Sequence, residues 1–140
     1  ARNGHALTWD CEALGLRVIL RHAKSQGRFF LSGQFGDYPV LPPIWTFAAE
    51  DGTGAGEFRH FPKPEGPAPG GSWLFIAHNG RGVICAPFSR LSYGSEGPHP
   101  GWGDAAHWRT VESNKVHAHE IGLMLAVIDR DLQYTTGRMA

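Results

Sequence analysis

The 140-residue sequence lacks the features that define several large classes of protein. Its two cysteines are too few for a disulfide framework, and free thiols in a reducing, cytoplasmic compartment are the simpler interpretation. No apolar run approaches the roughly 20 residues that a membrane-spanning helix needs, and no signal peptide opens the chain. The formal net charge of +0 is not the electrostatic footprint of a nucleic-acid-binding protein. We therefore expect a cytoplasmic protein that binds neither membranes nor nucleic acids.

A proline-rich segment organises the first half of the chain. Three prolines lie between positions 39 and 43, and they exclude a helix because each fixes φ and lacks an N–H group. The flanking residues 28–35 and 44–47 are aromatic and β-branched, as is typical of strands. Residues 16–22 alternate well enough for a further, half-buried strand. These segments predict an antiparallel meander with short turns.

The second half of the chain is richer in turn residues. In the segment 48–71, ten of 24 residues are Gly or Pro, and a structureless stretch of this length is usually functional or mobile. Residues 72–77 and 83–88 predict two more strands, and the dipeptide Asn79-Gly80 between them is a strong hairpin signal. Residues 89–109 are expected to form a loop.

A long helix is expected at the C-terminal end, from a capping Ser113 to about Tyr134, with Gly137 as its stop signal. Apolar side chains recur in it at helical spacing in two rows, which are Val116, Leu123 and Val127, and beside them Met124 and Ile128. Such a helix should cover one face of the sheet. The sequence thus predicts a single domain of the α+β class.

Two motifs resemble those of the ubiquitin-conjugating enzyme family. The family pattern YPxxPPxxxF is matched by Tyr38, Pro39, Pro42, Pro43 and Phe47, and the pattern G-x-I-C by Gly82, Ile84 and Cys85. The resemblance covers roughly residues 15–134. It implies a UBC-like fold over residues 1–140, in which about four antiparallel strands are covered by the long helix. It also implies a shortened N-terminal helix, with residues 48–71 as an insertion.

The resemblance implies a transferase reaction at Cys85. The thiolate would accept a ubiquitin-like protein from a ubiquitin-activating-type enzyme as a thioester and pass it to an amine on a target. The expected partners are these two proteins and a target protein or ligase, and no cofactor is needed. For the oxyanion, which needs a donor about 3 Å away, the first candidate is Asn79 and the second is His78. His99 and Asp104, with His107, are the candidates for deprotonating the amine.

The sequence also departs from the family pattern. The family has a His-Pro-Asn triplet shortly before the cysteine, whereas this chain has Phe75-Ile76-Ala77 at that offset. The departures indicate a divergent, prokaryotic relative. They leave two alternatives open: a catalytically inert UBC/RWD-like module that binds a ubiquitin-like protein or partner enzyme, and a cysteine hydrolase in which a histidine activates Cys85. The active transferase needs Cys85 exposed at a loop edge, and a buried Cys85 would select the inert module.

Each candidate residue has a purely structural interpretation. Cys85 between two apolar residues is also what a small core residue looks like, and Asn79 is also an ordinary turn residue. Trp102 and Trp108 are expected to pack the loop onto the core. His117 and His119 are two positions apart, so that a helix would direct them to different faces and away from a shared metal.

Overall fold

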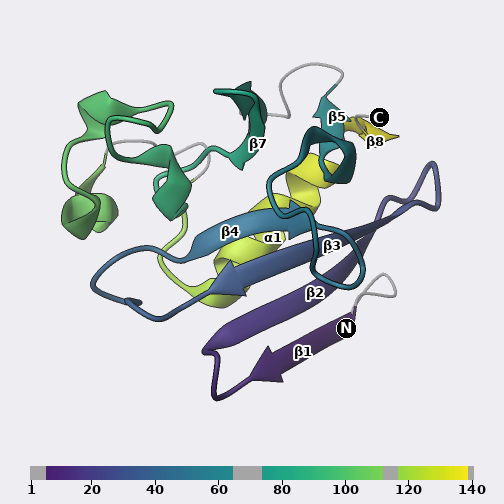
Figure 1. Ribbon diagram of the computed structural model, residues 1–140, viewed down its shortest axis with the longest axis horizontal. Coiled ribbons are helices and arrows are strands. Elements are labelled where there is room, and N and C mark those ends of the chain that lie inside the picture. Colours follow the sequence, from purple (N-terminus) through teal and green to yellow (C-terminus); the bar gives the residue numbers. More distant parts are fainter. Residues whose placement is uncertain (1–5, 65–73, 112–116, 139–140) are drawn as a thin grey trace.

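The first four strands of the computed structural model, which describes residues 6–64, 74–111 and 117–138, form one antiparallel sheet. They are β1 (Ala6–Asp10), β2 (Gly15–Arg21), β3 (Arg28–Gln34) and β4 (Ile44–Ala48), each paired with the next in the chain (Figure 1). The predicted meander is therefore confirmed, and the chain is of the α+β class.

The burial of the sheet follows the alternation of the sequence. In β2 the side chains of Leu16, Val18 and Leu20 are buried, whereas those of the alternate residues are exposed or only partly buried, as at Arg17, Ile19 and Arg21. Successive side chains of a strand point to opposite faces, so the sheet has one apolar face and one mixed face. The apolar face forms the core with α1 (Ile121–Leu132), which lies across it (Figure 1).

The N-terminal strand β1 was not predicted. In the described residues the place of the implied shortened N-terminal helix is taken by β1 and a turn at residues 11–14. The Trp9 ring packs on the Phe35 ring, with 5.6 Å between centroids. The Asp10 carboxylate accepts hydrogen bonds from the N–H groups of Glu12 and Ala13. These contacts favour a strand followed by a side-chain-stabilised turn over a helical start.

The C-terminal helix is shorter than the sequence predicts. It starts at Ile121 rather than near residue 113, and the predicted cap Ser113 lies outside the described residues. Residues 117–119 lie outside the helix: His117 Nε2 is 2.7 Å from the carbonyl oxygen of Trp108, and the carbonyl oxygen of His119 accepts a hydrogen bond from the Tyr38 hydroxyl. These contacts to distant segments keep the chain out of the helix.

Only one of the two predicted apolar rows forms the buried stripe of the helix. Met124 and Ile128 are fully buried, which confirms their row, whereas Leu123 in the other row is 55% exposed. Val127 is partly buried, and Val116 lies outside the described residues. Neighbouring helix positions are about 100° apart, so a helix centred on Met124 turns Leu123 away from the sheet.

A further strand follows the helix. The predicted end near Tyr134 falls in a turn, and the predicted stop residue Gly137 lies inside a strand, β8 (Thr135–Arg138). β8 pairs with β5 (Pro62–Pro64), inside the segment 48–71 that the resemblance treats as an insertion.

The segment 48–71 is structured as far as it is described. It contains the short 3-10 helix η2 (Phe58–His60) as well as β5, and residues 65–71 lie outside the described part. The Phe61 ring is fully buried with its centroid 5.2 Å from that of Phe47, and the N–H of Gly56 donates to the carbonyl oxygen of Phe47. An aromatic anchor and backbone hydrogen bonds thus order the described part of this Gly/Pro-rich segment.

The predicted hairpin around Asn79-Gly80 is confirmed. Strand β6 (Phe75–His78) pairs with β7 (Arg81–Ile84) in a separate two-stranded sheet. Asn79 and Gly80 have φ values of 50° and 75°, which is the left-handed pair that a two-residue hairpin turn requires.

The predicted loop 89–109 contains three short 3-10 helices, η3 (Arg90–Ser92), η4 (Pro100–Trp102) and η5 (Ala105–Thr110).

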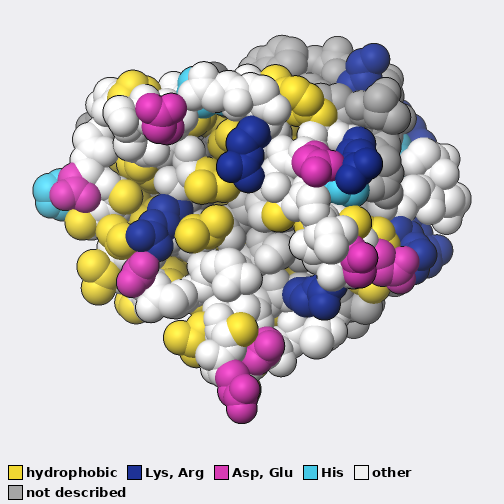
Figure 2. Space-filling model, in the orientation of Figure 1, with side chains coloured by type: hydrophobic (Ala, Val, Ile, Leu, Met, Phe, Trp, Pro, Cys, Tyr) yellow, Lys and Arg dark blue, Asp and Glu magenta, His cyan; other side chains and the backbone are white. Residues whose placement is uncertain are grey.

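No helix in the described part of the chain is long and apolar enough to cross a bilayer. Figure 2 shows positive and negative side chains intermingled on one face of the molecule. Ion pairs in the described part of the chain include Arg28 with Glu50 and Arg59 with Glu57.

Candidate functional site

Arg90 links the proline segment to the residues that follow Cys85. Its backbone N–H donates to the carbonyl oxygen of Pro43 at 3.0 Å, and its guanidinium is 2.6 Å from a carboxylate oxygen of Asp37. Asp37 and Pro43 lie at the two ends of the proline segment, and Arg90 follows Cys85 by five positions. Strand β4, which contains Phe47, also contacts β7, which contains Gly82 and Ile84, so the two segments that carry the family resemblance lie side by side.

A second fastening joins the same proline segment to η5. The carbonyl oxygen of Pro39, whose peptide bond to Tyr38 is cis, accepts hydrogen bonds from Trp108 Nε1 at 3.1 Å and from Arg109 Nη1 at 3.0 Å. The Arg109 guanidinium also lies over the Trp108 ring, 4.2 Å from its centroid. Trp108 is fully buried, so its predicted packing role is confirmed, and Trp102 packs partly buried against Tyr93.

Cys85 lies directly after the last residue of β7 and is almost completely enclosed. It is 7% exposed, and its neighbours Ile84 and Ala86 are fully buried. Its N–H donates to the carbonyl oxygen of Leu74. Burial raises the pKa of the Cys85 thiol to about 11, against a smaller lowering by a hydrogen bond from Ser92. At neutral pH the side chain is therefore a protonated thiol, whereas the nucleophilic form of cysteine is the thiolate.

The other cysteine has a different environment. Cys11 is exposed in the turn between β1 and β2, and both cysteines are free. Cys11 is therefore the natural internal control for the chemistry of Cys85.

The structure does not bring His78 and Asn79 to Cys85. They lie at the hairpin end of β7, and Cys85 follows its opposite end. Four strand residues span about 13 Å, whereas an oxyanion donor has to lie about 3 Å from its acceptor. The Asn79 amide nitrogen is instead 3.4 Å from the carbonyl oxygen of Glu96. The two residues line an open cavity of about 610 Å³ whose walls also include Arg81, Arg90, Tyr93 and Glu96.

His99 lies near His78 of this hairpin. Its ring is stacked on that of Trp102, with 4.0 Å between centroids and 6° between planes. Burial lowers the pKa of His99, and the charge of nearby His78 lowers it further. The structure therefore brings these two predicted histidines into electrostatic contact, and a neutral His99 at pH 7 is the form that a general base requires.

Asp104 has a structural role. Its carboxylate accepts a hydrogen bond from the N–H of Ala106 at 2.9 Å and so caps η5. His107 is an exposed residue within η5, and its carbonyl oxygen accepts a hydrogen bond from the Thr110 hydroxyl. The signal for the cap was present in the sequence, because aspartate is a preferred N-cap residue.

His117 and His119 lie side by side, although the predicted helix would have directed them to different faces. Their ring centroids are 4.4 Å apart, and both rings lie against Trp108. The argument that helical spacing separates them fails, because both residues precede α1. Burial lowers the pKa of His117. In the described residues there is no group of three or more His, Cys, Asp or Glu side chains that could hold a metal ion.

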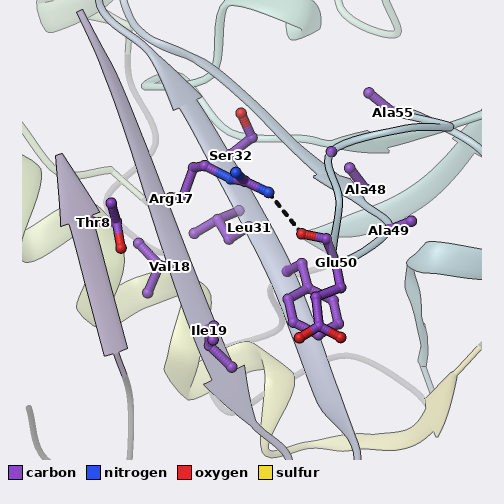
Figure 3. A pocket seen from close by; sticks show the side chains of 12 residues that line it. Thr8, Arg17, Val18, Ile19, Leu31, Ser32, Ala48, Ala49, Glu50 and Ala55 are labelled. Carbon is purple, nitrogen blue, oxygen red and sulfur yellow. Dashed lines mark hydrogen bonds between the residues drawn. The ribbon is translucent and has the colours of Figure 1, made fainter. Parts of the chain in front are cut away.

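A second cavity lies on the mixed face of the four-stranded sheet. It has a volume of about 300 Å³, and its lining includes outward-facing residues of β2 and β3, namely Arg17, Ile19, Phe30 and Ser32 (Figure 3). At one side the Arg17 guanidinium donates to the carbonyl oxygen of Glu50 at 2.7 Å. The strand alternation was the signal that could have located these residues, and none of the predicted site residues is among them.

Sequence reasoning also missed Ser92, which is fully buried beside Cys85. A serine in a segment read as loop gives no signal of its own, and only the fold of η3 brings it to the cysteine. Comparison of the chain with protein-family models, with curated proteins and with solved structures found no match.

Proposed function

We propose that this chain is a ubiquitin-conjugating-enzyme-like transferase that carries a ubiquitin-like protein on Cys85. The observation that carries the proposal is the meeting of the two motif segments, which lie more than 40 positions apart in the chain. Arg90 joins the residues after Cys85 to both ends of the proline segment. A rigid support of this kind suits a reaction that depends on the position of one sulfur atom.

The proposed reaction has two transfers. The Cys85 thiolate attacks the thioester carbonyl at the C-terminus of the ubiquitin-like protein, and the thiolate of the activating enzyme leaves. An amine of the target then attacks the carbonyl of the Cys85 thioester, the Cys85 thiolate leaves, and the amine loses a proton to form an amide bond. Cysteine suits both steps because its thiolate is a nucleophile and a leaving group.

The environment of Cys85 sets a condition on this reaction. With a pKa of about 11, only about one thiol in ten thousand is ionised at pH 7. The 7% exposure also leaves little of the residue open to a large thioester. Docking of the activating enzyme would have to expose the sulfur and favour its ionisation. The isolated chain is therefore expected to react slowly with electrophiles at Cys85.

The burial of Cys85 favours a second candidate function. A UBC/RWD-like module without transferase activity would bind a ubiquitin-like protein or a partner enzyme and keep Cys85 as a core residue. The absence of an aligned His-Pro-Asn triplet agrees with this alternative. The two functions differ in one measurable property, which is the formation of a covalent adduct at Cys85.

A charging assay separates the two functions. The chain is incubated with an activating-type enzyme, ATP and its ubiquitin-like protein, as wild type and as Cys85→Ala, Cys85→Ser and Cys11→Ala. The transferase predicts an adduct that reductant cleaves, that Cys11→Ala retains and that Cys85→Ala loses. Cys85→Ser should form an ester that resists reductant. No adduct on the wild type, in a system that charges another carrier, would overturn the proposal in favour of the binding module.

A further inference from the structure

The hydroxyl group of Ser92 lies against the backbone on both sides of Cys85. The Ala86 N–H donates to Ser92 Oγ at 3.1 Å, and Ser92 Oγ is 3.5 Å from the carbonyl oxygen of Ile84. Burial raises the pKa of the Cys85 thiol, and the same hydroxyl lowers it. One serine oxygen therefore bonds to the residue before and the residue after the proposed reactive position.

The backbone of η3 holds Ser92 in this place. The N–H of Ser92 donates to the carbonyl oxygen of Ser89, and its own carbonyl oxygen accepts from the N–H of His99, both at 3.0 Å. The Ser92 side chain is fully buried, so that bulk water does not compete for the hydroxyl. The backbone of Ser92 is thus held by hydrogen bonds at its N–H and at its carbonyl oxygen, and the buried surroundings limit the directions in which its hydroxyl can point.

The hydroxyl of Ser92 can donate its single proton to only one acceptor at a time. The oxygen already accepts from Ala86, so its single proton can go to Ile84 O or to Cys85 Sγ. The contact with Ile84 is at the long limit of hydrogen bonding and is weak. A bond from a hydroxyl to an anionic sulfur is charge-assisted and stronger. Ionisation of Cys85 should therefore draw the proton from Ile84 towards the sulfur.

We propose that Ser92 is the positioning residue for Cys85, whose hydroxyl donates to Sγ whenever the sulfur carries negative charge. In the proposed transferase this is the state of the attacking thiolate and of the leaving thiolate, and the proton stays on Ser92 Oγ throughout. The biological role of this bond rests on the proposed function. The bond itself is a property of the folded chain.

Ser89 is a matched control within the same turn. It lies three positions before Ser92 and is also fully buried, and its hydroxyl has no hydrogen-bond partner among the described residues. Substituting alanine at either position removes one buried oxygen atom, but only the change at Ser92 removes a bond to the Cys85 sulfur.

The test measures the ionisation of Cys85 in a Cys11→Ala background, where Cys85 is the one thiol left. Thiolate absorbance and the pH dependence of iodoacetamide alkylation each give an apparent pKa. A hydrogen bond to a charged group is worth about a factor of ten or more, so Ser92→Ala should lower the thiolate fraction at a fixed pH about tenfold. Ser89→Ala should leave the profile at its wild-type position.

A second pair of variants guards against misfolding. Ser92→Thr keeps the hydroxyl and Ser92→Val has nearly the same shape without it, so the Thr variant should titrate at lower pH than the Val variant. Equal profiles in this pair, or an equal shift in Ser89→Ala, would overturn the proposal. These titrations need no activating enzyme. A failed charging assay therefore leaves this inference standing, whereas unchanged profiles in a chain that can be charged would refute it alone.

Discussion

The sheet with its helix and the loop-rich region around Cys85 are held together by different interactions. In the four-stranded sheet and α1, apolar side chains at strand and helix spacing pack into one core. From β7 to η5, side chains bond to distant backbone carbonyls, as Trp108 and Arg109 do to Pro39. The first region is therefore held by packing that recurs along each element, whereas the second adds individual hydrogen bonds between distant segments to its share of the core.

The two regions are coupled through Phe47. Its ring is fully buried and packs against three other aromatic rings, those of Phe29, Phe61 and Phe75, at centroid distances of 5.2–6.0 Å. One partner lies in the sheet, one in the Gly/Pro-rich segment 48–71, and one in the hairpin that leads to Cys85. Stability and the geometry at Cys85 are therefore expected to fail together when this residue is changed.

The largest effect should come from Phe47→Ala. Truncating a buried phenylalanine costs about 3–5 kcal/mol, a large part of the stability of an ordinary domain. Urea unfolding followed by fluorescence measures the change. Leu123→Ala, at a helix position that is 55% exposed, is the control and should cost far less. Comparable losses in the two variants would contradict the central place of Phe47.

The next effect is a fall in stability at alkaline pH that depends on Cys85. Its thiol has a pKa of about 11 in the fold against an ordinary value of 9.0, so the folded chain binds more protons between these values. The contribution is complete below pH 9 and is lost as the pH rises to about 11, a change of about 2 kcal/mol. The measurement is the difference in unfolding free energy between wild type and Cys85→Ala from pH 8 to 11. A difference that stays constant would show that burial does not shift this thiol.

The contrast between the regions also explains what the sequence predicted well. Alternation located β2 and β3, the Asn79-Gly80 pair located the hairpin, and Met124 with Ile128 located the buried face of α1. Each of these signals is local, because it depends on residues a few positions apart. The resemblance to the ubiquitin-conjugating enzyme family also rests on local motifs, those around Pro42 and Cys85.

The errors have the opposite character. The helix begins late because His117 and His119 bond to distant residues. Ser92 reaches Cys85 only through the fold of the loop. Such contacts join positions far apart, and no periodic pattern announces them. Candidates chosen by closeness in sequence, as Asn79 was, can lie a full strand length from the residue they were meant to serve.

A smaller effect is expected from Gly82→Ala, within the motif before Cys85. A Cβ at this position would lie 2.5 Å from Cδ1 of the fully buried Phe61 ring. Overpacking of this kind costs about 1–3 kcal/mol, and the displaced ring should disturb the hairpin that leads to Cys85. Thermal unfolding measures the loss. Gly36→Ala, where a Cβ meets nothing within 4 Å, is the control, and similar unfolding temperatures for the two variants would argue against this contact.

The smallest effect in stability should come from breaking the ion pair between Asp37 and Arg90. The side chains are 57% and 34% exposed, so water screens the pair and its worth is about 0.2–1 kcal/mol. A double-mutant cycle with Asp37→Asn and Arg90→Gln gives this coupling energy, and the cycle of Glu57→Gln with Arg59→Gln is its control away from Cys85. The two couplings should be similar and should shrink in high salt.

Of these two ion pairs, the Asp37–Arg90 pair is the one that joins the proline segment to the cysteine loop. Its loss, and not that of the control pair, should therefore speed hydrogen exchange at the Arg90 N–H, which donates to Pro43. Unchanged exchange there would mean that the backbone bonds alone hold the two motif segments together.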